Sequence, residues 1–450
     1  MKQKTTIKER KHTFNRYAWR QFKKNKLAYL SFRILVVLVI IALLCPILAN
    51  DKPLYIKYEG SHYFPAFSFK NHYEILNTES GKHEKIQLDI ADWKRMDLEN
   101  VIWAPVSYSP NKSEKLNRYL NAGYKSPGDK QLFDNKEGEV IEIPARFRHW
   151  LGTNKKGEDV LAGLIHGTRT SLLIGMLSMG IASIIGLITG ALAGYYGDTK
   201  LTATRGSFWL FVVGVLTAYY YGFMMRSFSL EDGLAGSGFS FIFQCLISLV
   251  IFTAICGVFY YTGKYVGKIP GLNKQVSVPV DLIISRVIEM LTSIPRLILI
   301  ISFAAIASEP SLFNVMVIIG LTSWAGIARL TRAEFLKVRE LEYIEAAKAL
   351  GYSERRIIFT HALPNCLAPA VVAIAFGVAS AILIESGLSF LGIGLPHDVV
   401  TWGSLLSAGK ENFDAWWLVI FPGLAIFLTV TIYNLIGDGL RDALDPRLKG

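Results

Sequence analysis

Long apolar stretches alternate with short charged loops along most of the chain. Each stretch is about 20 residues or longer, which is the length that an α-helix needs to cross the hydrocarbon core of a membrane. Eight segments fit this description, and we expect each to be a transmembrane helix: Leu27–Ala49, Ser171–Tyr196, Gly206–Met225, Phe239–Thr262, Asp281–Ser308, Ser311–Leu330, Leu367–Gly392 and Trp416–Gly437. The pattern therefore predicts an all-α polytopic membrane protein.

The distribution of basic residues predicts which side each loop faces. Ten Lys or Arg residues and a single Glu lie in Met1–Lys26, before the first apolar stretch, and such flanks stay in the cytoplasm. With this end inside, the other short basic loops and the tail at residues 438–450 also fall inside, whereas the acidic loop Arg226–Gly238 falls outside. We therefore expect both termini in the cytoplasm.

This orientation signal also explains the net charge of +12. A basic flank next to an apolar stretch is far more typical of membrane topology than of a nucleic-acid-binding arm, so we expect no nucleic-acid partner. Only 19% of the residues are charged, against about 25% in soluble domains. The composition thus argues against a soluble two-domain enzyme.

Residues 50–150 form a separate polar unit after the first span. Turn signals alternate there with short runs of Tyr, Phe and Ile. We expect this insertion to be a small extracytoplasmic domain of mixed or β-leaning structure.

Among the segments expected inside, Arg329–Asn365 has the pattern of two short helices. Leu341–Leu350 is rich in good helix formers, and Gly351 after it is a common C-terminal stop. Ser353 is placed to cap a second helix, Glu354–Ala362, at its N-terminus.

Pro364 should close the second helix before the next span begins. The result would be a compact helical knob, in which Ala346 and Ala347 are small enough for close approach to a partner. The pattern alone is equally compatible with an amphipathic hairpin that lies on the inner leaflet.

The residues of this loop resemble a known motif. Glu345-Ala-Ala-x3-Gly351 followed by Leu363-Pro364 is similar to the EAA loop of the permease subunits of bacterial ABC importers, and His361 is typical of the dipeptide and oligopeptide branch. Further motifs of that branch occur in the same order: Leu151-Gly-Thr-Asn, Gly157-Glu-Asp-Val-Leu, Gly194-Tyr-Tyr-Gly197, Ser323-Trp-Ala-Gly-Ile-Ala-Arg329, Ser389-Phe-Leu-Gly-Ile-Gly-Leu395 and Gly437-Asp-Gly-Leu-Arg-Asp-Ala-Leu-Asp-Pro446. The segments Ala49-Asn-Asp-Lys-Pro, Tyr63-Phe-Pro65 and Trp103-Ala-Pro105 are similar to the Yej-type members.

The resemblance implies a subunit that moves oligopeptides or peptide-like antibiotics across a bacterial inner membrane by alternating access. Its implied partners are a second related permease subunit, two ABC ATPase domains, an extracytoplasmic peptide-binding protein and membrane lipid. It also implies a group of residues that couple the permease to the ATPase: Glu345, Ala346, Ala347, Gly351, His361, Leu363 and Pro364. The two spans within 206–262 are additional to the six-helix core usual in this family.

No enzymatic signature is visible in the sequence. The pattern G-x-x-x-x-G-K-[ST], which binds nucleotide phosphates, does not occur. We therefore expect that this chain is not an enzyme and binds no cofactor, and that ATP and Mg²⁺ bind to the partner subunits. The alternative is a secondary transporter or channel that needs no ATPase, although the inverted repeats typical of such proteins are not apparent.

Ionisable residues at membrane depth are candidates for the translocation pathway. Arg286 and Glu289 lie three residues apart, on one helix face, and can pair. It is equally open that this half of the helix protrudes into the cytoplasm. Glu385 is expected either near an outer gate or at the membrane interface. Arg296 follows Pro295, where we expect a helix irregularity.

Overall fold

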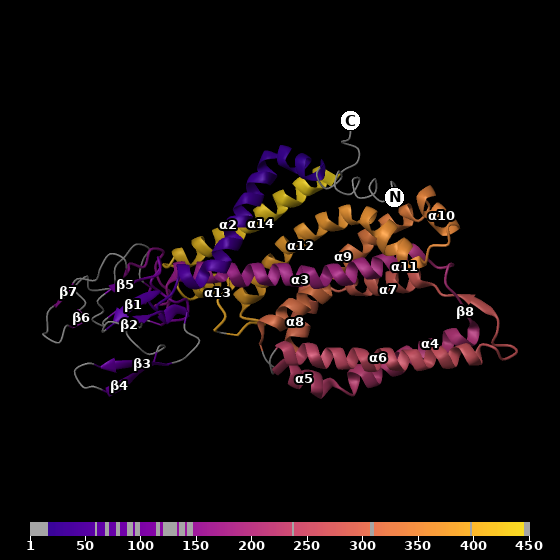
Figure 1. Ribbon diagram of the computed structural model, residues 1–450, viewed down its shortest axis with the longest axis horizontal. Helices are drawn as coiled ribbons and strands as arrows, with labels where there is room; N and C mark the ends of the chain where they lie inside the picture. Colours follow the sequence, from indigo (N-terminus) through magenta and orange to yellow (C-terminus); the bar gives the residue numbers. More distant parts are fainter. Residues whose placement is uncertain are drawn as a thin grey trace. The chain divides into compact units, whose positions relative to one another are not determined.

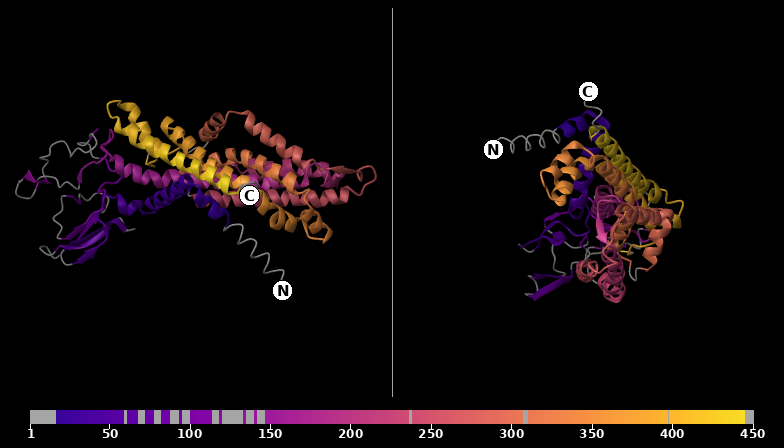
Figure 2. Two further views of the ribbon diagram at one scale, coloured as in Figure 1. Left: turned by 90° about the horizontal axis from the view of Figure 1, so that it is seen from above. Right: turned by 90° about the vertical axis from the view of Figure 1, so that its right-hand side faces the viewer.

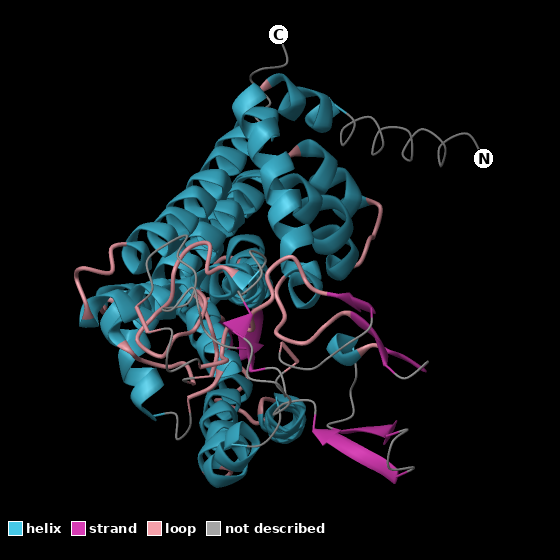
Figure 3. Cartoon of the chain, turned by 90° about the vertical axis from the view of Figure 1, so that its left-hand side faces the viewer, coloured by secondary structure: helices cyan, strands magenta, loops and turns pink. Residues whose placement is uncertain are grey.

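Helices make up most of the described chain, and strands are confined to short segments (Figure 3). The computed structural model describes residues 17–58, 61–67, 72–77, 82–87, 93–94, 100–113, 118–119, 133–134, 140–141, 147–235, 238–306, 310–396 and 398–444. The chain forms two compact units, of which one contains Met176–Ala381 with the segments Met1–Asn25 and Gly437–Gly450, and the other contains Lys26–Gly175 and Ile382–Ile436.

Seven helices of the described residues are long and apolar enough to cross a membrane (Figure 1). They are α2 (Lys26–Leu48), α3 (Val160–Tyr196), α4 (Arg205–Tyr219) continued by the π turn η4 (Tyr220–Met224), α6 (Gly238–Val266), α9 (Leu312–Val338), one helix formed by α11 (Glu354–Arg356), η5 (Ile357–Ala362) and α12 (Leu363–Leu391), and α14 (Trp417–Leu444). A bent helix pair brings the count to eight when it is taken as one span. The predicted all-α polytopic fold is confirmed, and the eight predicted spans correspond to seven candidate spans and this bent pair.

The bent pair replaces the continuous helix that we predicted from Asp281. Helix α7 (Val280–Ser293) and helix α8 (Arg296–Ile306) meet at an angle of 85°. Ile294 between them has an extended backbone, because the ring of Pro295 disfavours the helical conformation in the residue before it. The predicted irregularity at Pro295 is thus a full break.

Short antiparallel strands occur in the insertion between α2 and α3. The strands β1 (Tyr55–Tyr58), β2 (Ser61–Tyr63) and β5 (Asn100–Ile102) form a sheet in the order β2-β1-β5, and β3 (His72–Asn77) pairs with β4 (Lys82–Gln87), as β6 (Phe133–Asp134) does with β7 (Val140–Ile141). The single turn η1 (Pro65–Phe67) follows β2. These strands agree with the β-leaning prediction, while the side of the membrane on which the insertion lies stays a prediction.

The two extra spans form a helical hairpin whose two chain ends are joined by a pair of short strands. Strand β8 (Thr202–Thr204) pairs with β9 (Gln275–Ser277), and between them α4 and α6 run side by side, joined through the short helix α5 (Ser227–Ala235) (Figures 1 and 2). The amide of Leu282 in α7 donates to Asp198 Oδ1 at 2.9 Å, just before the hairpin begins. The chain therefore passes from α3 to α7 over a short connection, with the hairpin inserted into it.

Helix α3 lies directly against α9 along a row of three glycines. A Cβ atom added to Gly186, Gly190 or Gly194 would lie 2.8, 2.5 or 2.5 Å from the nearest atom of α9. Their four-residue spacing places the glycines on one helix face, and small residues of this kind allow membrane helices to approach closely. The last of the three lies beside the loop that was predicted as a helical knob.

Replacing Gly194 with Val should therefore destabilise the protein. The new Cβ would lie 2.5 Å from Phe335 Cβ and 2.7 Å from the carbonyl oxygen of Arg332, and overpacking of this kind costs about 1–3 kcal/mol. We expect a lower thermal unfolding midpoint for the detergent-purified protein. Gly180→Val on the same helix is the matched control, because nothing lies within 4 Å of a Cβ there. Equal midpoints for the two variants would contradict the close packing.

Candidate functional site

The first helix of the predicted knob, α10 (Glu342–Ala349), ends in a hydrogen-bonded bend. The amide of Gly351 donates to the Lys348 carbonyl at 2.9 Å, and the amide of Tyr352 donates to the Ala347 carbonyl at 3.1 Å. This Schellman arrangement needs a left-handed residue at its bend, and Gly351 has a φ of 72°. The predicted helix and its glycine stop are confirmed.

The second helix does not end before Pro364, as we expected. Ser353 has the extended backbone of an N-cap residue, and the helix that begins at Glu354 continues through η5 and α12 to Leu391. A π turn widens a helix, and η5 lies directly before the proline, where an α-helical turn would clash with the ring. The predicted end at Ala362 is therefore wrong, and the knob is rigidly continuous with the following span.

One buried apolar cluster holds the knob against the ends of α3 and α9. It contains side chains from α3, α9, α10, η5 and α12: Ala191, Tyr195, Phe335, Val338, Ile344, Ala347, Ile357, Ile358, Ala362 and Cys366. Leu363 and Tyr352 pack against it while partly exposed. Because the two helices of the knob share this core with two spans, the four elements form one packed body.

Two polar contacts reinforce this packing at the end of α3. The Tyr196 hydroxyl donates to Glu354 Oε2 at 2.8 Å, which joins the last residue of α3 to the start of the second knob helix. Arg339 Nη1 donates to the Gly194 carbonyl at 3.2 Å. Both contacts connect α3 to the segment that follows α9.

The side of the knob next to α3 carries charges of both signs. Lys200 Nζ lies 4.4 Å from the centre of the Tyr195 ring. Burial lowers the pKa of Lys200, and the positive charges of Lys348 and Arg339 lower this pKa further, whereas Glu340 and Glu354 oppose the shift. Arg339 also pairs with Glu340 at 2.8 Å.

The exposed face of the knob combines an acid with large apolar side chains. Glu345 and Ala346 are exposed, and Leu350 and Phe359 are 71% and 57% exposed. Ala347, which we expected to face a partner together with Ala346, is buried in the cluster instead. Ile344 and Ala347 lie three positions apart and form the buried face of this helix, whereas Ala346 lies outward.

His361 lies behind this face in a stack of flat side chains. Its ring is parallel to that of Tyr352, with 5.7 Å between the ring centres, and Arg356 lies 4.3 Å from the same tyrosine ring. Within the described part of the chain, the buried His361 Nε2 has no hydrogen-bond partner. The stacking of His361 on Tyr352 therefore stabilises the bend between the two knob helices. Pro364 is exposed.

The first pair of candidate pathway residues forms an exposed ion pair on α7. Arg286 Nη1 lies 2.6 Å from Glu289 Oε2, with 68% and 61% of the two side chains exposed. The start of α7 is fixed to α9 by Asp281, which accepts hydrogen bonds from Nε and Nη2 of Arg332. The predicted pairing is confirmed, and the role in a pathway stays a prediction.

Glu385, the third candidate, is buried in a cage of hydroxyl groups. Its side chain is fully inaccessible, and it accepts hydrogen bonds from Ser389 Oγ at 2.7 Å and Ser171 Oγ at 3.4 Å. The amide of Trp402, at the start of α13 (Trp402–Ala408), donates to Ser171 Oγ at 3.5 Å. The carboxylate thus joins α3 and α12 from inside, and its predicted position near an outer gate or at the membrane interface stays a prediction.

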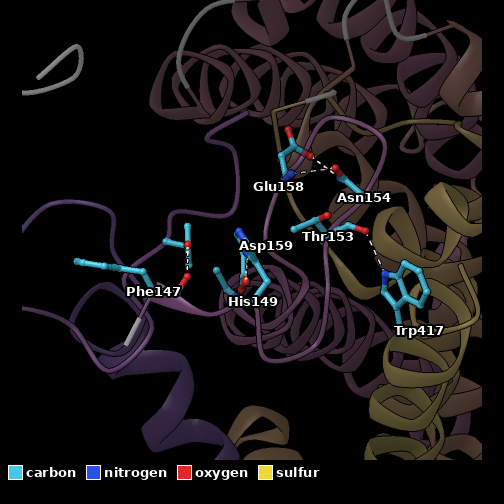
Figure 4. A network of polar contacts seen from close by, with 9 residues as sticks. Phe147, His149, Thr153, Asn154, Glu158, Asp159 and Trp417 are labelled. Carbon is cyan, nitrogen blue, oxygen red and sulfur yellow. Dashed lines mark hydrogen bonds and ion pairs between the residues drawn. The ribbon is translucent and has the colours of Figure 1, made fainter. Parts of the chain in front are cut away.

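A further polar network fixes the start of α3 (Figure 4). His149 Nδ1 and Asp159 Oδ2 are 2.8 Å apart and both side chains are buried. The other oxygen of Asp159 accepts from the amide of Ala162 at 2.7 Å, which caps the helix. Trp417 of α14 donates from Nε1 to the Thr153 carbonyl at 3.0 Å. The motif before α3 is thus a structural junction.

These features define a polytopic membrane protein that presents a helical knob between two of its spans, and the comparisons with known proteins agree. Residues 265–450 match the family of the binding-protein-dependent transport system inner membrane component, and residues 13–65 match the N-terminal TM domain of oligopeptide transport permease C. The chain belongs to the family of multi-pass inner-membrane permease subunits of ABC transporters.

Individual relatives cover most of the chain. The inner membrane ABC transporter permease protein YejE of Escherichia coli (strain K12) is 30% identical over 436 residues, which are 96% of this chain and 97% of that protein. The peptidoglycan transport system permease protein YejE of Agrobacterium fabrum is 26% identical over 95% of this chain and 92% of its own length. The dipeptide transport system permease protein DppC of Alkalihalophilus pseudofirmus is 31% identical over 67% of this chain and 73% of its own length.

Sequence reasoning missed the residues that seat the knob. Tyr196 and Gly194 belong to a motif that was noted only as a resemblance, and no pattern connected that motif to Glu354, which lies 158 positions further along the chain. Leu350 and Phe359 were also missed, because exposure of an apolar residue depends on the three-dimensional packing. The motif Gly194-Tyr-Tyr-Gly197 could have indicated these contacts, because it places both tyrosines at the very end of a span.

Removing the Tyr196 hydroxyl should loosen the knob without unfolding the protein. A hydrogen bond of this kind contributes about 0.5–1.5 kcal/mol to stability. In Tyr196→Phe, the amides of residues 342–362 should therefore exchange with deuterium roughly three- to tenfold faster. Hydrogen exchange followed by mass spectrometry measures this rate. Glu354→Ala, which removes the acceptor, should have the same effect. The double variant should add little to either, because both changes remove one contact. Independent, additive effects would show that this contact does not hold the loop.

Proposed function

We propose that this chain is the subunit through which an ABC importer moves peptides or peptide-containing compounds into the cytoplasm. The observation that carries the proposal is the knob, which is packed onto two spans and carries the exposed residues Glu345, Leu350 and Phe359. The printed names of the relatives, which include a dipeptide and a peptidoglycan transport permease, support a peptide or peptide-containing cargo.

The exposed face of the knob is the contact for a separate ATPase. Leu350, at the end of the short helix α10, and Phe359, early in the second helix, are exposed apolar side chains suited to an apolar groove on a partner, and Glu345 would meet a basic residue there. Two ABC ATPase domains would bind ATP and Mg²⁺ and carry out the hydrolysis. This permease would supply the moving spans.

Motion of the ATPase would reach the spans through the packed body described above. The knob continues into α12 without a break and shares a buried core with the ends of α3 and α9. A rigid connection of this kind transmits a displacement, whereas a loop tethered only at its ends would absorb it. Gly351 fixes the angle between the two knob helices, and His361 braces that angle.

The pathway would run along α7, between this subunit and a second, related permease. The Arg286–Glu289 pair is exposed on a helix of a predicted span, and charges at membrane depth are unfavourable against lipid. In this proposal this face lies against the partner permease or a water-filled pathway. The buried Glu385 would hold the surrounding helices in one arrangement instead of touching cargo.

In this proposal both termini and the knob are cytoplasmic, and residues 50–150 face outward. An extracytoplasmic peptide-binding protein would deliver the cargo to that side. Positive flanks inside follow the charge rule for inner-membrane proteins, and the insertion falls outside because it follows the first span.

Two substitutions in the knob test the coupling. Glu345→Lys reverses an exposed charge, and Gly351→Pro removes the left-handed bend, because proline fixes φ near −65°. In proteoliposomes that contain the complete complex, we expect peptide uptake to fall at least about tenfold, the equivalent of 1.4 kcal/mol of lost contact. Stimulation of ATP hydrolysis by the peptide-loaded binding protein should be lost as well.

Asp414→Lys is the matched control, since it makes the same charge change at an exposed acid far from the knob in sequence. Uptake by this control should match that of the unaltered protein. Normal uptake by both knob variants would show that the knob is not the coupling site. Uptake by the unaltered permease without ATPase or ATP would favour the alternative, a secondary transporter or channel.

A further inference from the structure

The hairpin of α4 and α6 carries a strongly basic end. Arg205, Lys264, Lys268 and Lys274 are all exposed there. The structure brings them together, because the amide of Arg205 donates to the Lys274 carbonyl at 2.8 Å. A Cβ on Gly206 would contact Val266 and Gly267 at the end of α6, which places Lys264 and Lys268 beside the same end.

No acidic residue offsets this charge within the hairpin end. Between residues 199 and 280 the only acids are Glu231 and Asp232, which lie at the opposite end, in or next to α5. Within the described part of the chain, none of the four basic side chains forms an ion pair. The charge is therefore available to a bound anion.

Exposed apolar and aromatic side chains lie among these charges. Tyr265, Ile269 and Leu272 are 71%, 50% and 36% exposed, and Lys268 Nζ lies 5.6 Å from the centre of the Tyr265 ring. Basic residues interleaved with tyrosines at the end of a span are typical of the boundary between lipid headgroups and acyl chains. A soluble anion would gain nothing from this apolar component.

An apolar groove lies further along the same hairpin. A cavity of about 330 Å³ lies between α4 and α6 and is lined by Thr217, Tyr221, Ala254, Ile255, Val258 and Phe259. At 1.5 Å per helical residue, Phe259 lies roughly 7 Å from Lys264 along α6, and Thr217 lies roughly 18 Å from Arg205 along α4. The hydrocarbon of one leaflet is about 15 Å deep, so the groove begins among the acyl chains of that leaflet and extends to the middle of the bilayer.

We propose that the α4–α6 hairpin is a binding site for an anionic phospholipid, with the headgroup phosphate on Arg205, Lys264, Lys268 and Lys274 and one acyl chain in the groove. The site needs only that the hairpin crosses the membrane, and it does not depend on the cargo or on the ATPase. It gives the two extra spans a function of their own. The hairpin would anchor the permease in a shell of anionic lipid at the point where the chain passes from α3 to α7.

The test is a lipid titration of the full-length protein, purified in neutral detergent and followed by native mass spectrometry. Dioleoyl phosphatidylglycerol should bind at least about tenfold more tightly than dioleoyl phosphatidylcholine, because each basic side chain near a headgroup favours anionic lipid. Inorganic phosphate at millimolar concentration should not compete. Equal binding of the two lipids would overturn the proposal and leave the groove to bulk lipid or a partner helix. Effective competition by phosphate would overturn it in favour of a soluble anion.

Two variants separate the headgroup from the acyl chain. Replacing Arg205, Lys264, Lys268 and Lys274 together with Gln should abolish the preference for phosphatidylglycerol. Ala254→Phe fills the groove, keeps every charge and should weaken phosphatidylglycerol binding severalfold. Val250→Phe, at an exposed position of α6 outside the groove, is its control and should bind as the unaltered protein does. Full preference in the Gln variant, or equal binding by the two Phe variants, would overturn the site.

Discussion

The close approach of α3 to α9 is the constraint on which the rest of the coupling site depends. Gly186, Gly190 and Gly194 leave no room for a side chain between the two helices. This approach brings Tyr195 and Tyr196 under the knob, where one joins its buried core and the other bonds to Glu354. Without this close approach of α3 to α9, the knob would be connected only to α9 and α12, and its motion would be uncoupled from α3.

The sequence predicted the features that depend on local patterns. Span number follows from the length of apolar runs, and the bend at Gly351 follows from the residue preference of a left-handed position. The Arg286–Glu289 pair was predictable from its three-residue spacing. Membership of the permease family was also predictable, because its motifs keep their order over a long part of the chain.

The remaining features depend on contacts between distant segments. The local rule that proline ends a helix failed at Pro364, because the preceding π turn accommodates the ring. The burial of Glu385 could not be predicted, because it depends on Ser171, more than 200 positions earlier in the chain, and on helix α13. Ala347 was assigned to the exposed face because a motif does not state which side of a helix meets the chain's own core.

The central claim is that the knob and the end of α3 move as one body. The distance between the knob and the end of α3 can be measured with spin labels at Ala346→Cys and Thr199→Cys, in a variant whose four native cysteines are replaced. The measurement uses pulsed electron paramagnetic resonance on the complete complex. The account predicts one narrow distance distribution that is the same with and without ATP, while the rest of the transport cycle proceeds. A distance that shifts or broadens when ATP binds would contradict it, because the knob would then move independently of the span on which it is packed.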